Sequence, residues 1–489
     1  MTLARTGAWL ALAVAALLTT ESRLHGENAP LSRLDGDVEA LGSYRPGYAF
    51  WRHIFMIPDG SIAFGSALDG RLLAVLPAKG DWSQPSAEAD PAVAAVLANA
   101  SLPSNLDDRR TKLAELLEPV VGPVLHNPTR GDFLLPTSRR YGSFLKEWGA
   151  IYERFGVPAA IGLAQAALES GLSGTVKSEA RAIGFCQWKQ SNWKYLNRLA
   201  PSTIEGTNQT TQAPYCAAYL TILATRYGSF IPALSDHHSG GVNVGRVVIN
   251  GERLGGTNIR EQYLLGSQLA RDLRRLDLYG FRDLYRTYGP RSYAYAEMVF
   301  GNMATVRELT ETIPQSTIYA MRTARAIPLS EITKRTRLSA DEVRRYNPAL
   351  VKRVPAQADL YLPTYVREFG RDVSFWHRPP NQKYSAALAD FLALDAPPEH
   401  WDDGRLMPTL RAFERRFRES ASEEGTVMAT LLAYVMSDAE SSGRREILAE
   451  FRTDDDIRAL FNRGLLQRVE SSLALLPCEP VPDQQRSSC

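Results

Sequence analysis

Apolar side chains recur every three or four residues along most of the middle of the chain, as expected for helices that bury one face. The stretch VPAAIGLAQAALESG, residues 157–171, is a clear example. Pro158 stands where a helix begins and Gly171 where one ends, because proline suits the first turn and glycine the left-handed residue after the last. We therefore predict mainly α-helical structure over 106–310, with Glu169 in the last turn of one helix.

A different pattern occupies residues 46–82, where Asp-Gly pairs at 59–60 and 69–70 separate apolar runs. Asp-Gly between apolar runs is a strong hairpin signal, because both residues tolerate the positive φ of a tight turn. We predict a small N-terminal β-meander of three strands in this segment. A linker with one short helix follows over 83–105.

The pattern changes twice more toward the C-terminus. Residues 317–365 indicate a strand, two helices and a second strand. Ser339 or Asp341 can cap the second of these helices, and the Asn-Pro pair at 347–348 ends it. After a Pro-rich boundary, residues 383–478 again have helical periodicity and show no candidate chemistry.

Composition adds little to this division but excludes some functions. The chain has 489 residues, which corresponds to roughly three domains. Its 56 basic and 54 acidic side chains give a net charge of +2. So balanced a charge, without a long Lys/Arg run, argues against a nucleic-acid partner.

The first twenty residues have the features of an export signal. Arg5 supplies positive charge, and Ala8 to Leu18 form an uninterrupted apolar core. Because this core is shorter than the ~20 residues that span a bilayer, we predict a signal peptide over residues 1–20. An uncleaved, marginal anchor is the alternative, and no cysteine is present there for lipid attachment.

Four cysteines occur, and an exported chain can oxidise them. The local pairing joins Cys186 to Cys216 and Cys478 to Cys489, but four cysteines allow three connectivities. Cys186 and Cys216 can equally be two small buried residues.

Glu169 is the candidate for chemistry. Cleavage of a glycosidic bond needs a protonated acid beside the leaving oxygen, and an apolar environment keeps a carboxyl protonated. The negative end of the helix dipole has the same effect. Candidates for the apolar surroundings are Leu168, Leu172, Phe185 and Trp188. The alternative is an ordinary solvated glutamate at a helix end.

The spacing around Glu169 resembles the catalytic motif of the lytic murein transglycosylases, a family related in fold to goose-type lysozyme. That motif has a Glu-Ser pair followed at fixed offsets by Pro, Ser, small residues, glycines and Gln. The positions that match are Glu169, Ser170, Ser178, Ala180, Ala182, Gly184 and Gln187. Gly174 replaces the Pro, and Arg181 places a bulky cation where the family has a glycine.

A second block, residues 236–248, resembles the family's A-Y-N-A-G segment and the G-R-V that follows it. Gly240, Gly245, Arg246 and Val247 match. His237 and His238 stand where the family has Tyr and Asn, of which the Asn lies in the sugar-binding cleft. The resemblance places His238 in that cleft, whereas a plain surface loop is the alternative.

A third block, residues 291–303, resembles the family's T-x-x-Y-V segment. Ser292 stands for the Thr, and Tyr295 stands for the Tyr that hydrogen-bonds the catalytic Glu. The resemblance therefore implies contact between Tyr295 and Glu169. Without the other blocks, Tyr295 would be taken for half-buried helix core.

The layout is most similar to that of the membrane-bound type D enzymes, because residues 317–365 resemble a LysM module. Leu329, Ile332, Leu338 and Val343 fit the LysM core, although the usual G-D-T-L opening is missing. LysM modules bind N-acetylglucosamine polymers. A generic linker domain with the same order of elements is the alternative.

The resemblance implies an enzyme that cuts the glycan strands of peptidoglycan in the periplasm or cell envelope. Glu169 would be the catalytic acid and base, and Ser170, Ser178, Gln187, His238 and Tyr295 would bind substrate. No metal or cofactor is implied. Two alternatives remain: a binding or scaffold protein without activity, and a lysozyme-type hydrolase with Asp236 or Glu179 as second carboxylate.

Overall fold

Helices account for most of the computed structural model, which confirms the mainly α prediction. Contacts group the chain into two compact units: Met1–Leu234 with Ala296–Ser442, and Ser235–Tyr295 with Gly443–Cys489. The structure describes residues 29–83, 89–200, 204–276, 284–285, 290–366, 369, 378–394, 406–441 and 443–474. The predicted signal peptide lies outside these ranges. Every helix within them is too short or too polar to cross a lipid bilayer.

The N-terminal β region of the first unit is a three-stranded antiparallel sheet with the order β2-β1-β3. The predicted hairpin is confirmed as β1 (Ser61–Ser66) and β2 (Leu72–Pro77). The prediction of three consecutive strands within residues 46–82 was wrong, because β3 is Val124–Pro128. A short 3-10 helix η1 (Pro46–Phe50) and the helix α2 (Trp51–Met56) occupy the start of the predicted β segment.

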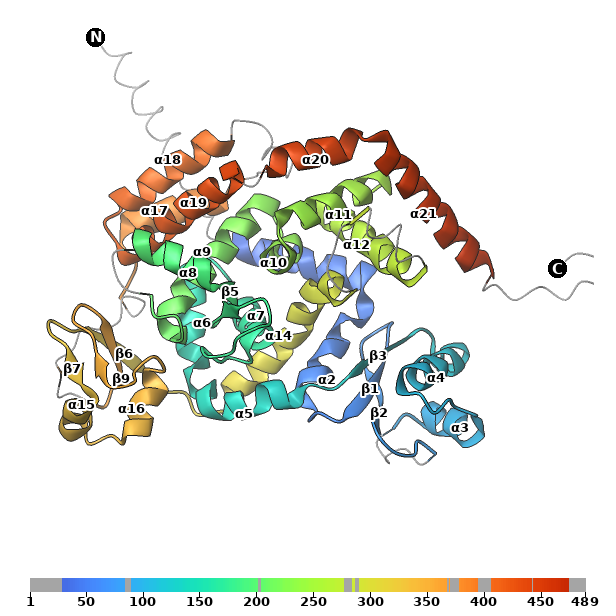
Figure 1. Ribbon diagram of the computed structural model, residues 1–489, viewed down its shortest axis with the longest axis horizontal. Helices are drawn as coiled ribbons and strands as arrows, with labels where there is room; N and C mark the ends of the chain where they lie inside the picture. Colours follow the sequence, from blue (N-terminus) through green and yellow to red (C-terminus); the bar gives the residue numbers. More distant parts are fainter. Residues whose placement is uncertain are drawn as a thin grey trace, which may run out of the picture. The chain divides into compact units, whose positions relative to one another are not determined.

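Two helices cover this sheet, as Figure 1 shows beside β1–β3: α3 (Pro91–Asn99) and α4 (Leu106–Val121). A hairpin cannot bury both of its faces by itself, so its apolar face needs a covering layer. Leu113 and Leu117 of α4 share one core with Ile62 and Phe64 of β1. Residues 106–121 therefore belong to the sheet rather than to the helical domain in which the sequence placed them.

The helical core of the first unit follows the sheet along the chain. Trp148 of α6 and Phe185 are fully or nearly fully buried, with ring centroids 4.9 Å apart. The helix α9 is buried along almost its whole length. The elements are α5 (Gly131–Tyr141), η2 (Gly142–Phe144), α6 (Leu145–Arg154), α7 (Ala159–Ser170), α8 (Gln190–Leu199), α9 (Gln209–Tyr227) and α14 (Tyr295–Thr312), whose first residue is assigned to the second unit.

The helices predicted over 383–478 are present but do not form one region. Those of the first unit pack on the helical core: Arg154 of α6 forms a buried ion pair of 2.7 Å with Glu424, and the Tyr384 hydroxyl donates to the Arg154 carbonyl at 3.0 Å. They are α17 (Gln382–Leu392), α18 (Leu406–Glu419) and α19 (Glu423–Ser441). The last two helices, α20 (Arg444–Thr453) and α21 (Asp455–Ala474), belong to the second unit.

Residues 318–363 contain the predicted strand, two helices and strand, with one further short strand on each side of the helices (Figure 1). Ser339 is the cap of the second helix, in a reciprocal capping box with Glu342. The Asn347 side chain does more than end that helix, because it bonds the carbonyl and N–H of Tyr361 at 2.7 and 2.8 Å. The elements are β6 (Ile318–Arg322), β7 (Ile327–Pro328), α15 (Leu329–Thr336), α16 (Ala340–Tyr346), β8 (Arg353–Val354) and β9 (Asp359–Pro363), with β6 antiparallel to β9 and β7 to β8.

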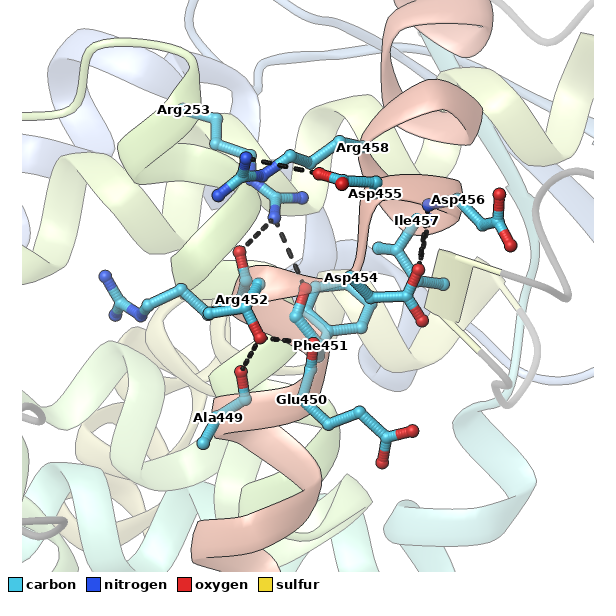
Figure 2. A network of polar contacts seen from close by, with 11 residues as sticks. Arg253, Ala449, Glu450, Phe451, Arg452, Asp454, Asp455, Asp456, Ile457 and Arg458 are labelled. Atoms are coloured by element: carbon cyan, nitrogen blue, oxygen red, sulfur yellow. Dashed lines mark hydrogen bonds and ion pairs between the residues drawn. The ribbon is translucent and has the colours of Figure 1, made fainter.

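The second unit contains α11 (Gly241–Arg253) and α12 (Ile259–Leu276), on which α20 and α21 pack. The Arg253 guanidinium donates to the carbonyls of Phe451 and Arg452 at 3.3 and 3.1 Å, as Figure 2 shows. A cation there satisfies carbonyls that the end of α20 leaves unpaired. The Asp454 carboxylate then caps α21 by accepting from two of its first N–H groups.

Candidate functional site

Glu169 lies in the last turn of α7, as predicted, and its side chain is half-buried. The rest of this helix is largely buried. Gly171 ends it with φ of 57°, and a Cβ at this glycine would lie 2.3 Å from the Phe133 carbonyl oxygen. The chain therefore must turn at Gly171. This arrangement differs from the solvated helix end that was the alternative.

The residues after Glu169 form a loop that is closed by its own hydrogen bonds. The Ser170 hydroxyl is fully buried and lies 3.1 Å from the carbonyl oxygens of both Ala166 and Phe185. The Gln187 amide donates to the Val176 carbonyl at 2.9 Å and to the Gly184 carbonyl at 3.0 Å. The matching residues thus hold the loop in place, and their binding of substrate stays a prediction.

Ser178 stabilises a turn at the exposed end of this loop. Its backbone N–H donates to the Ala182 carbonyl, and its hydroxyl accepts from the Ala182 N–H, both at 3.0 Å. Arg181 lies within the turn with φ of 61°. Position 181 thus requires a left-handed backbone, which is the reason that glycine suits it better than arginine.

A disulfide between Cys186 and Cys216 ties the loop to α9. This pairing was one of the predicted connectivities and is confirmed, whereas Cys478 and Cys489 lie outside the described residues. A second link to α9 lies near the disulfide in the sequence: the Gln212 side chain accepts from the Phe185 N–H at 2.6 Å. Two short strands, β4 (Ala182–Ile183) and β5 (Trp188–Lys189), complete the loop.

Several of the predicted apolar neighbours surround the loop. Leu172 and Phe185 are fully buried, Trp188 is 6% exposed, and Leu168 is half-buried. Sequence reasoning missed one aromatic neighbour, Tyr152 of α6, whose side chain is fully buried. Burial and, second, the negative charge of Glu169 raise the pKa of the Tyr152 phenol. The two side chains therefore interact electrostatically.

Two of the predicted site residues, Ser292 and Tyr295, lie next to His238 in the second unit. The element that carries it is the helix α10 (Phe230–Ser239), whose His237 and His238 are in the second unit, rather than a surface loop. The His238 ring stacks on Tyr295 with centroids 4.4 Å apart and 7° between planes, and its Nε2 lies 3.2 Å from the Ser292 hydroxyl. His238 is exposed as a residue, but the surrounding protein lowers the pKa of its ring to about 4 by desolvation.

Tyr295 and Glu169 belong to different units, so their predicted contact stays a prediction. Ser292 and Tyr295 both belong to the second unit. Ser292 lies in a 3-10 helix η3 (Pro290–Ala294), and Tyr295 is the first residue of α14. Asp236, a possible second carboxylate, is 2% exposed and lies 4.0 Å from the Arg444 guanidinium. Glu179, the other possible second carboxylate, is exposed on the loop between α7 and α8, residues 171–189, which we call the motif loop.

A large pocket of the first unit lies elsewhere. Its walls are mainly aliphatic, and Glu169 is not among its lining residues. Leu34, Leu145, Leu163 and Leu392 contribute to it. It is therefore not the place where the predicted chemistry would occur. Over the described ranges, no three His, Cys, Asp or Glu side chains gather as metal ligands would.

No profile of a known protein family matches the chain, and no curated protein is significantly similar to it. The resemblance to lytic transglycosylases consequently rests on the matching residues of the sequence.

Proposed function

We propose that the protein is a lytic transglycosylase that cleaves the β-1,4 bond between N-acetylmuramic acid and N-acetylglucosamine in peptidoglycan. The observation that carries this proposal is the setting of Glu169. It is a half-buried acid at the end of a buried helix, and the loop after it is held by Ser170, Gln187 and the Cys186–Cys216 disulfide. Glu169, Ser170 and Gln187 are among the motif positions at which the sequence resembles the family.

The chemistry needs one residue that acts first as an acid and then as a base. Glu169 donates its proton to the glycosidic oxygen, the bond from that oxygen to the muramic C1 breaks, and the N-acetylglucosamine side leaves as an alcohol. The Glu169 carboxylate then takes the proton of the muramic C6 hydroxyl, whose oxygen bonds C1. The product is a 1,6-anhydro end, no water is consumed, and Glu169 is protonated again.

The other parts of the chain are assigned roles consistent with this reaction. We propose that the helical core has a lysozyme-like fold and that residues 318–363 are a LysM-like module that binds the glycan. The basis is the βααβ order and the buried Ile332, Leu338 and Val343. An export signal at residues 1–20 would bring the protein to the periplasm or cell envelope, where peptidoglycan lies.

Product analysis tests the proposal. Purified protein is incubated with murein sacculi, and the released muropeptides are analysed by mass. Anhydro-muramyl ends support the transglycosylase, reducing ends indicate a hydrolase, and binding without release indicates a scaffold protein. Glu169→Gln should lower release by at least about 100-fold while leaving the thermal unfolding midpoint nearly unchanged. Release by this variant at the wild-type rate would contradict the assignment of Glu169.

A burial argument favours the transglycosylase over the hydrolase. A hydrolase needs a second carboxylate or a held water on the opposite face of the sugar. Asp236 is buried beside Arg444, and Glu179 lies on the exposed outer turn of the motif loop. An acid that works alone therefore accounts for the described residues with fewer assumptions.

A further inference from the structure

One face of α7 carries a small residue, an amide and the acid in line. Gly162, Gln165 and Glu169 are separated by three and four residues, so they lie on the same side of the helix. The Tyr152 ring of α6 packs against this face at Gly162. A Cβ on Gly162 would lie 2.1 Å from the Tyr152 Cδ1, so only glycine admits the ring.

Tyr152 places a phenol in the protein interior without a protein partner. Its side chain is fully buried and packs near Phe185, with centroids 6.5 Å apart. Its hydroxyl forms no hydrogen bond to any described residue. Buried polar groups are normally bonded, and exceptions call for a specific explanation.

Gln165 is a second such exception on the same face. It is 1% exposed, and neither its amide nitrogen nor its amide oxygen is hydrogen-bonded within the described structure. Leucine would suit this position better if packing were its only task, because it has no polar atom to leave unsatisfied. Two unsatisfied polar side chains next to one acid therefore indicate a functional demand.

Most other charged groups on the neighbouring elements are exposed or paired elsewhere, whereas Glu147 of α6 and Arg226 of α9 are buried. Arg154 of α6 is paired with Glu424, and the motif-loop charges are exposed to solvent, which screens them. The charged groups of α5, α6, the motif loop and α9 are Asp132, Arg139, Arg140, Lys146, Glu147, Glu153, Arg154, Lys177, Glu179, Arg181 and Arg226. None of these groups shifts the pKa of the Tyr152 phenol through its charge, whereas Glu169 does.

We propose that Tyr152 and Gln165 are positioning residues that hold the Glu169 carboxyl from its buried side and set the pH range in which it works. This inference rests on the proposed function, in which Glu169 alternates between its protonated and ionised forms.

The two side chains have the chemistry for that alternation. An amide can accept a hydrogen bond from a protonated carboxyl and donate one to a carboxylate, so Gln165 can serve both forms. The Tyr152 phenol keeps its proton because burial and the charge of Glu169 raise its pKa, so it can donate a hydrogen bond to the carboxylate and thereby favour that form. Such contacts often tighten only when substrate binds.

The test uses three variants of the full chain with soluble glycan strands prepared from murein. Tyr152→Phe and Gln165→Met remove the two polar groups at nearly constant volume. Tyr384→Phe is the matched control, because it also removes a buried tyrosine hydroxyl, in this case one that donates to the Arg154 carbonyl. For each variant, kcat and KM for the release of anhydro ends are measured from pH 4 to pH 9.

Tyr152→Phe removes a donor to the carboxylate, so Glu169 should hold its proton to higher pH. The alkaline limb of the kcat profile should then move up by about 0.5–1 pH unit with KM unchanged. Gln165→Met should lower kcat by about tenfold. Neither variant should lower the thermal unfolding midpoint, since each removes unsatisfied polar atoms, whereas Tyr384→Phe should lower it and leave the profile unmoved.

Two different failures can be told apart. If wild type releases no anhydro ends, or releases them as fast as Glu169→Gln does, the proposed function falls and this inference falls with it. If wild type is active, Glu169→Gln is inactive, and both positioning variants keep the wild-type kcat and pH profile, only the inference is overturned.

Discussion

The motif loop after Glu169 and the segment around His238 both resemble segments of the family, but their residues form different kinds of contact. In the loop, the matching Ser170, Ser178 and Gln187 all bond to the loop's own backbone or to the end of α7. In the second segment, His238 stands where the family has Asn, and its ring stacks on Tyr295. The loop residues that match the motif are therefore ones whose side chains hold the backbone of the loop.

Within the loop, Gly184 and Arg181 differ in the space that is available to a side chain. Both have positive φ, 93° and 61°. Gly184 matches the family and has the Gln212 amide against it, whereas Arg181 departs from the family and projects into solvent. A left-handed residue with free space around it tolerates a side chain at a modest cost, but one in close contact does not.

Removing the disulfide should have the largest effect on the loop. The bond closes a loop with a sequence separation of 30 residues, so the Cys186→Ser, Cys216→Ser double variant should lose about 3–4 kcal/mol of unfolding free energy. Denaturant unfolding of the oxidised wild type and the variant measures this difference. Equal midpoints would show that the hydrogen bonds alone hold the loop.

Gly184→Ala should come next, at about 2–3 kcal/mol of destabilisation. The new Cβ would lie 2.3 Å from the Gln212 Oε1, which accepts from the Phe185 N–H. Gly206→Ala is the matched control, because no atom lies within 4 Å of a Cβ there and it should change stability little. A similar loss in both variants would argue against a specific close contact at Gly184.

His238 should make stability depend on pH. Its pKa is lowered to about 4 by desolvation, so between pH 6.5 and 4 the unfolded chain binds the proton more readily than the folded one. The neutral ring thus contributes fully above pH 6.5, and this contribution disappears as the pH falls to 4. Because His238 is exposed, solvent screening should reduce the loss to about 1 kcal/mol.

His238→Phe keeps an aromatic ring against Tyr295 without a titrating group. Its unfolding free energy should fall less than that of wild type between pH 6.5 and 4, as measured by denaturant titrations at several pH values. If the unfolding free energies of the two proteins changed equally with pH, a residue other than His238 would be taking up the proton.

Arg181→Gly should have the smallest effect, a gain of about 0.5 kcal/mol, because glycine adopts the left-handed backbone without strain but costs more chain entropy. Arg181→Ala removes the charge and keeps the strain, so it should give no gain. Thermal unfolding of the two variants measures the difference. A gain in both would assign the effect to the charge instead of the backbone.

The sequence alone determined the features that depend on near neighbours. The end of α7 at Gly171, the hairpin of β1 and β2, and the cap at Ser339 were predicted, because turn and cap residues act within a few positions of themselves. The motif offsets likewise located the loop around Glu169. Hydrogen bonds between residues close together in the sequence close this loop on itself, whereas the Cys186–Cys216 disulfide and Gln212 tie it to the distant helix α9.

Only the tertiary structure decided the features that join distant segments. The strand β3 pairs with β1 across two intervening helices, and α20 and α21 separate from the other C-terminal helices to pack on α11 and α12. Tyr152 meets α7 at a glycine that no periodic pattern marks. Periodicity tells which face of an element is buried but not which partner covers it, because that choice is made by packing between surfaces far apart in the chain.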